Sequence, residues 1–251
     1  MRRFRARARN RQIDILVKHA EARYVGLENV RYRYAIDFAI DGDLRYIAHN
    51  DTVRLFARAS ARARLPVCFT QGFNPRARVA IAFPRPVGQA SDVERLLIDL
   101  TEEVDRTWLI DALQARMPAG AVLKRAIVWP ASVSCRPRWV RYRVKCPGVC
   151  AKSVLPSITD LLDSERLEVT RVRHRDARSC VVDIRPFVDT ITVADEAVFV
   201  SVHVTESGSA APVEVCRLLG MEACAANHCV RRVEIRWHDE EQHDPKTNTT
   251  T

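Results

Sequence analysis

Polar side chains gather just before the first predicted helix, where they could act on or hold an anionic ligand. His49, Asn50 and Asp51 stand where a strand pattern changes to a helix pattern. Backbone N–H groups at a helix start attract anions, and a histidine beside them can act as a general acid or base near neutral pH. The alternative is an ordinary N-cap made by Asn50 or Asp51, with His49 as a half-buried packing residue. His49 is therefore the candidate catalytic residue, although the local sequence alone favours the packing role.

An arginine row follows on the predicted helix. Arg54, Arg58 and Arg62 recur every four residues, so they lie along one helix face. Arginine forks bind phosphate in a bidentate manner, so this row, with Arg45 upstream, predicts a surface that tracks an RNA backbone. The alternative is a solvated helix face without a ligand, which is the commoner use of such a pattern.

The segment 71–75, Gln-Gly-Phe-Asn-Pro, predicts a rigid turn. Gly72 permits a positive φ, and Pro75 pushes the residue before it towards an extended conformation. Gln71 and Asn74 both donate and accept hydrogen bonds, so the turn could read a base edge, hold a ligand carbonyl or brace the His49 turn. We expect the helix start, the arginine row and this turn to converge at one end of the first half. The candidate residues for binding substrate or nucleic acid are Arg45, Asp51, Arg54, Arg58, Arg62, Gln71, Gly72, Phe73 and Asn74.

The composition of the 251 residues favours a polyanionic partner. The formal net charge is +9, and the positive excess is carried both by the leader 1–30 and by the body of the chain. Such a balance suits RNA, DNA or a phosphorylated ligand, and the alternative is a merely soluble basic surface. No apolar run is long enough to cross a membrane, and no secretory signal is visible. We therefore expect a cytoplasmic protein that does not engage a membrane.

The cysteines and the common catalytic motifs predict neither a metal nor a cofactor. Eight cysteines are scattered through the chain, and without an export signal they are expected to be reduced thiols. Cys146 and Cys150 lack the third cysteine of a radical SAM cluster, and Cys224 and Cys229 lack a second pair to complete a tetrahedral site. No phosphate-binding glycine loop with its lysine, no HExxH and no GxSxG motif occurs.

The order of predicted elements indicates an α+β fold. In the first half, strand and helix periodicities follow one another as β-α-β-β-α-β, the split βαβ order of the ferredoxin-like fold. The predicted segments are strand 31–40, helix 50–64, strands 78–83 and 94–100, helix 107–116 and strand 122–129. Residues 44–48 are expected to be a short extended piece, and Asn50 or Asp51 to cap the helix.

The second half repeats that order weakly, with an extra strand. Its predicted segments are strand 139–146, helix 154–162, strands 168–174, 180–186 and 197–204, helix 212–219 and strand 229–237. We therefore predict two ferredoxin-like halves that arose by duplication. The predicted parts are a flexible basic leader 1–30, a first half 31–133, a second half 134–237 and a disordered acidic tail 238–251.

Several motifs together resemble those of the radical SAM-linked family, a domain of unknown function. They are Gly-Asp-Leu-Arg at 42–45, His49-x-Asp51, the arginine-rich helix, Gln-Gly-Phe-Asn-Pro at 71–75 and Pro-x-Pro-x-Gly at 84–88. The similarity covers about 31–237, and its first half is the more specific. This chain departs from the family in Asn50, where an apolar residue is usual, and in its basic leader.

Members of that family are fused to, or encoded beside, cobalamin-binding radical SAM proteins, and some accompany ribonuclease E/G-type proteins. Because this chain has no radical SAM cluster motif, the resemblance implies a separate partner of such a protein. It also implies RNA processing or modification, and it raises His49 and Gln71 as site residues.

Three hypotheses for the function remain open. The first is an accessory module without activity of its own, which binds RNA or presents a substrate to a radical SAM partner. The second is a metal-independent ribonuclease-like enzyme, in which His49 is the acid or base and Arg45 or Arg54 stabilises the developing charge. The third is a protein-docking scaffold that binds no nucleic acid.

Overall fold

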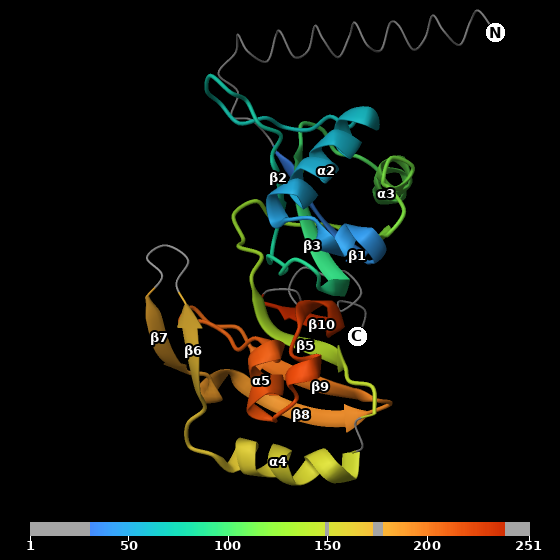
Figure 1. Cartoon of the computed structure of the whole chain (residues 1–251). Coiled ribbons are helices and arrows are strands. Elements are labelled where there is room, and N and C mark those ends of the chain that lie inside the picture. The colour runs from blue at the N-terminus through green and yellow to red at the C-terminus, as the bar shows by residue number, and fades with distance from the viewer. Residues whose placement is uncertain (1–30, 149–150, 173–177, 239–251) are drawn as a thin grey trace, which may run out of the picture. The chain divides into compact units, whose positions relative to one another are not determined.

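The protein has a mixed α/β fold built on one large mixed sheet (Figure 1). The computed structural model describes residues 31–148, 151–172 and 178–238. The leader predicted over 1–30 and nearly all of the tail predicted over 238–251 therefore lie outside the described residues. No helix in the described ranges has the length and apolar character that a membrane crossing requires.

The main sheet has eight strands in the order β4-β1-β3-β10-β5-β9-β8, and β2 pairs with β3 beside that path. Its strands are β1 (Tyr32–Ile40), β2 (Val79–Ile81), β3 (Ala90–Leu100), β4 (Ala121–Val128), β5 (Pro137–Lys145), β8 (Val188–Ala194), β9 (Ala197–His203) and β10 (Val230–Trp237). A separate two-stranded ribbon is formed by β6 (Glu168–Val172) and β7 (Ser179–Asp183).

One parallel pairing joins the two predicted halves into a single sheet. Arg231 and Arg232 of β10 pair with Ala90 and Ser91 of β3. The other pairings between the described strands are antiparallel. The last strand of the second half therefore lies beside a central strand of the first, and polar side chains from both halves can meet at this seam.

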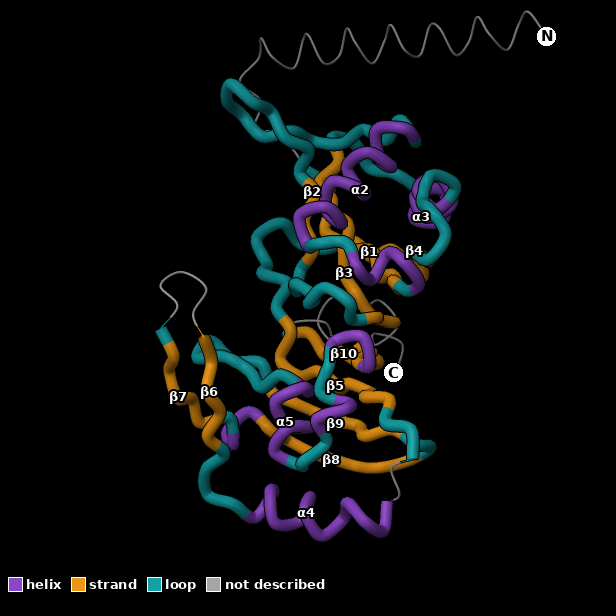
Figure 2. The backbone as a smooth tube through the Cα atoms, viewed as in Figure 1, coloured by secondary structure: helices purple, strands orange, loops and turns teal. Residues whose placement is uncertain are grey.

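Each half of the sheet has its own apolar core under helices (Figures 1 and 2). In the first half, Phe56 of α2 (His49–Arg62) packs against Phe38 of β1 with ring centroids 4.7 Å apart. Leu109 and Leu113 of α3 (Arg106–Gln114) are buried in the same cluster. In the second half, α4 (Ala151–Asp163) and α5 (Pro212–Leu218) contribute Ile158 and Val215, respectively.

The start of α2 differs from the prediction. The helix begins at His49, so Ala48 is the N-cap, and its side chain makes no capping bond. Residues predicted to be extended form a short 3-10 helix, η1 (Gly42–Tyr46), because Asp41 caps it by accepting a 2.8 Å bond from the Gly42 N–H. Asp51 lies in the first turn of α2, where its charge suits the helix dipole.

The second half contains one strand that lies outside the segments predicted from the sequence. Its β8 (Val188–Ala194) follows a short 3-10 helix, η2 (Arg185–Phe187), and pairs antiparallel with β9. Two more 3-10 turns, η3 (Glu222–Cys224) and η4 (Asn227–Cys229), precede β10. The last two residues of the predicted strand 168–174 lie outside the described residues, since residues 173–177 are not described.

Candidate functional site

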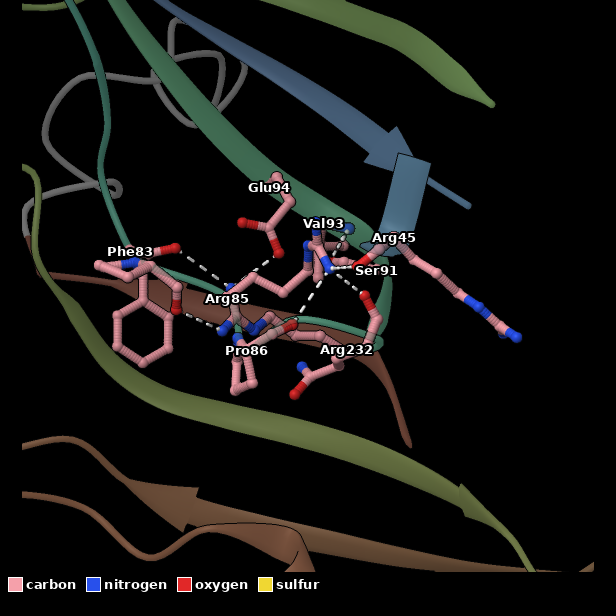
Figure 3. Close-up of polar contacts among 10 residues, drawn as sticks. Arg45, Phe83, Arg85, Pro86, Ser91, Val93, Glu94 and Arg232 are labelled. Carbon is pink, nitrogen blue, oxygen red and sulfur yellow. Dashed lines mark hydrogen bonds and ion pairs between the residues drawn. The ribbon is translucent and has the colours of Figure 1, made fainter. Parts of the chain in front are cut away.

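A loop that follows β2 places Arg85 at the seam of the sheet (Figure 3). The Arg85 guanidinium donates hydrogen bonds to the backbone carbonyls of Arg45 at 2.7 Å, Pro86 at 3.2 Å and Leu44 at 3.5 Å. It also bonds the Gln89 carbonyl. One side chain therefore ties η1, the loop and the start of β3 together.

Gly88 closes the same loop against η1. Its N–H donates to the Arg45 carbonyl at 2.8 Å, and its φ of +90° is one that side-chain-bearing residues rarely adopt. The proline-rich motif Pro-x-Pro-x-Gly at 84–88 is thus a loop whose backbone binds η1. The prolines restrict the φ angles of the loop, and Gly88 allows the positive φ that brings the loop against η1.

Glu94 and Arg232 form a buried ion pair beside this loop. The Arg232 guanidinium donates to Glu94 Oε1 at 2.8 Å, and the two residues are only 1% and 3% exposed. Arg232 also donates to the Pro84 carbonyl at 3.2 Å and lies over the Phe83 ring at 4.3 Å. We call Arg85, Glu94, Arg232 and the loop 84–89 the polar junction.

The electrostatics of the polar junction are those of a desolvated site. Burial lowers the pKa of Arg85, and the neighbouring Arg232 lowers it as well, whereas Glu94 opposes this shift. Burial also raises the pKa of Tyr142, which lies near Arg232. Two buried guanidiniums beside one carboxylate leave an excess positive charge. Hydrogen bonds to backbone carbonyl oxygens stabilise that charge.

We expect Arg85→Lys to lower the free energy of unfolding by about 1–3 kcal/mol, because an ammonium group cannot bond all these carbonyls at once. Urea unfolding followed by circular dichroism measures the change. Arg58→Lys on the exposed face of α2 is the matched control and should stay within about 0.5 kcal/mol of the parent protein. An equal effect of the two changes would contradict a bracing role for Arg85.

His49 reaches the edge of the polar junction. It lines a cavity of about 10 Å³ together with Thr52, Arg85 and Glu94, and apolar residues close the rest. That volume is close to the room that a single water needs, so the cavity as it stands does not admit a nucleotide. The catalytic role of His49 stays a prediction, with Glu94 and Arg85 as the charged groups beside it.

The arginine row of α2 divides into two parts. Arg54 and Arg58 are exposed, on the side opposite the buried Phe56, and Arg54 makes a solvent-exposed 2.9 Å pair with Asp51. Arg62 is exposed as well, but it donates to the Arg116 carbonyl at 2.6 Å, so it links the end of α2 to the residues that follow α3. Exposed pairs such as Arg54–Asp51 are worth little, so Arg54 remains able to exchange its partner for a phosphate.

The segment 68–78, which we call the hairpin arm, carries the Gln-Gly-Phe-Asn-Pro turn. The Thr70 N–H donates to the Arg76 carbonyl at 2.8 Å, and the Arg76 N–H donates to Thr70 Oγ1 at 3.0 Å. Residues 71–76 are all exposed, and Gly72 has a φ of +122°. Phe69 is 58% exposed and Phe73 is fully exposed, so the arm displays two aromatic rings to solvent.

The hairpin arm does not converge with His49, contrary to our expectation. Val67 pairs with Leu100 and the Cys68 N–H bonds the Asp99 carbonyl, so the arm leaves the sheet at the last residues of β3. Glu94, which shares a cavity with His49, lies about 20 Å back along that strand. Figure 2 shows the loop between α2 and β2 projecting beyond that end of the strand.

The predicted site residues therefore do not form one cluster, and those outside the arginine row of α2 fall into two groups. Arg45 lies near His49: its guanidinium donates to Tyr46 Oη at 2.8 Å and stands over that ring, and Arg85 binds its carbonyl. Gln71, Phe73 and Asn74 lie on the hairpin arm at the opposite end of β3, beyond the C-terminal end of α2.

The thiols that fall in the described residues do not form a metal centre. No group of three or more His, Cys, Asp or Glu side chains in those ranges is arranged to hold an ion. Burial raises the pKa of Cys146, and it raises that of Cys216 to about 12. Raised pKa values disfavour the thiolate form that binds metals and attacks electrophiles. Cys150 lies outside the described residues.

Two comparisons with known proteins bear on this arrangement. Residues 33–214 match the model of a family described as "Uncharacterized protein conserved in bacteria (DUF2344)". The match runs from β1 into α5, so it includes α2 and the hairpin arm and all of the polar junction except Arg232. A comparison with curated proteins finds no match. The resemblance to a domain of unknown function is thereby confirmed, and the link to radical SAM proteins stays a prediction.

Proposed function

We propose that this chain, which belongs to the DUF2344 family of bacterial proteins, is an accessory module that binds RNA and serves a cobalamin-binding radical SAM partner. The observation that carries the RNA part is that exposed residues line both the outer face of α2 and the tip of the hairpin arm. These residues combine arginines with unpacked aromatic rings and side-chain amides.

The chain itself links the two parts of this surface. α2 ends at Arg62, and the hairpin arm begins only a few residues later. The exposed arginines on this path are Arg54, Arg58, Arg62, Arg64 and Arg76. Guanidinium groups spaced along a helix and a turn suit the repeated phosphates of a nucleic acid, and exposed rings suit its bases.

The radical SAM part of the proposal is supported by the resemblance of the motifs at 42–88. The polar junction gives three of those motifs a shared role, because Arg85 joins η1 and the proline-rich loop beside His49. In this proposal the junction holds η1, which leads into the start of α2, and the chemistry belongs to the partner.

The topology also supports a duplication. Within the first half, the strands run in the order β4-β1-β3-β2, and within the second half in the order β10-β5-β9-β8. Numbered along each half, leaving aside the β6–β7 ribbon, both orders are 4-1-3-2. We propose that both halves are ferredoxin-like units derived from one ancestor, with the ribbon as an insertion.

The test is equilibrium binding of the full chain to a fluorescent 20-nucleotide single-stranded RNA at several salt concentrations. Four phosphate contacts on a single strand predict an affinity that falls about sevenfold for each doubling of salt. Absent or salt-insensitive binding would overturn the RNA proposal. A gel of the same samples shows whether the RNA stays intact, and cleavage that His49→Ala abolishes would favour the enzyme hypothesis.

A further inference from the structure

We infer that the tip of the hairpin arm binds an unpaired base of RNA, with the Phe73 ring as its stacking platform. This inference rests on the proposed RNA binding and names the form of RNA that the surface takes. Base faces are hidden inside a duplex, so an aromatic ring that stacks on a base selects single strands, loops and bulges.

The presentation of Phe73 supports this role. Its ring is fully exposed, although burying a phenyl ring normally stabilises a fold. The frame beneath it is held by the paired bonds between Thr70 and Arg76 and by the Phe69–Ala77 bridge. Stacking on a ring that a braced hairpin already presents costs little ordering entropy.

The chemistry around Phe73 favours a base over an apolar protein surface. Gln71 and Asn74 flank it with exposed amides, which can both donate to and accept from a base edge. Arg76 closes the turn through its backbone, and its exposed side chain can pair with the neighbouring phosphate. Two amides and a fixed positive charge around one ring are poorly matched to an apolar groove.

Arg64 provides an independent observation. It follows the C-terminal end of α2 with a φ of +56°, a left-handed conformation for which glycine is preferred at that place. The Leu65 N–H bonds the Ser60 carbonyl at 3.1 Å, as expected where a helix ends in this way. An arginine in a conformation that glycine adopts without cost supports a role for its exposed side chain in this inference.

The experiment compares a single-stranded 12-mer of uridine with a 12-base-pair RNA duplex, both bound by the full chain at 0.1 M salt. Phe73→Ala should weaken single-strand binding about tenfold or more and leave duplex binding unchanged. Phe73→Trp should retain single-strand affinity, and Phe73→Leu should lose it because leucine is apolar but does not stack. Tight binding by Phe73→Leu would overturn the inference in favour of an apolar contact.

Arg64→Gly separates function from folding. Glycine relieves the left-handed strain, so the melting temperature should rise by a few degrees, while the affinity for both RNAs falls several-fold. An unchanged affinity would remove Arg64 from the site. If the parent protein binds neither RNA, the proposed function itself fails. If it binds both RNAs and Phe73→Ala changes neither affinity, only the inference about the base fails.

Discussion

Glu94→Ala is expected to lower the free energy of unfolding by about 3–5 kcal/mol, the range found when one partner of a buried ion pair is removed. The change leaves the guanidinium of Arg232 without its carboxylate in a place where it is 1% exposed. The Pro84 and Phe83 carbonyls remain as acceptors, but they carry no charge. Urea unfolding of the full chain, followed by far-ultraviolet circular dichroism, measures the loss.

Two further variants make this prediction specific. The double change Glu94→Leu and Arg232→Met removes both charges and should recover much of the lost stability, since apolar pairs often replace buried ion pairs at little cost. Asp51→Ala breaks the solvent-exposed pair with Arg54 and should cost less than about 1 kcal/mol. A loss for Glu94→Ala as small as that for Asp51→Ala would contradict a buried pair.

The second large effect concerns RNA. Replacing Arg54 and Arg58 with glutamate should reduce the affinity for single-stranded RNA at least tenfold at 0.1 M salt and lower the salt slope by about one to two. Both side chains are exposed, so the free energy of unfolding should change little. Fluorescence anisotropy with the labelled 20-mer measures affinity and slope.

A matched charge control lies in the second half of the chain. Lys145 and Arg217 are also exposed, and replacing both with glutamate changes the net charge by the same amount. If the surface formed by α2 and the hairpin arm binds the RNA, this control should lose far less affinity. Equal losses would mean that RNA responds only to the overall charge.

Local periodicity predicted the helices and strands that bury one face at regular intervals along the sequence. Alternation in β1 follows from burial of its apolar side chains against α2, and the exposed Arg54 and Arg58 follow from the four-residue spacing. β8 was missed because its polar residues Asp189, Thr190 and Thr192 left too weak an apolar alternation after Pro186. The N-cap prediction failed because His49 itself begins the helix, which moves Asn50 and Asp51 into its first turn.

Local sequence patterns could not predict the polar junction, because the residues that bind one another in it are distant in sequence. Glu94 and Arg232 are separated by 138 positions, and Arg85 reaches carbonyls about 40 positions earlier. A single signal was present: Glu94 is in phase with Leu96, Ile98 and Leu100, the even-numbered residues after it in β3, which are apolar and buried. A carboxylate at such a position indicates a buried cationic partner, although it does not say which one.

The place of the hairpin arm also depends on long-range pairing. Its direction is set by Val67 and Val79, which pair with Leu100 and Ile98 of β3 on either side of the arm. Sequence proximity to His49 suggested one combined site, but these pairings carry the turn away along β3. The two parts of the site therefore lie at opposite ends of β3: the exposed hairpin arm at one end and the polar junction at the other.

The most direct test of the account is the salt dependence of RNA binding by the full chain and by the Arg54→Glu, Arg58→Glu protein. If the surface formed by α2 and the hairpin arm binds RNA, the logarithm of the parent's affinity should fall with the logarithm of salt at a slope of about −3, and the variant should have a shallower slope and a weaker affinity. A parent protein that binds no RNA, or two proteins with identical affinities and slopes, would contradict it.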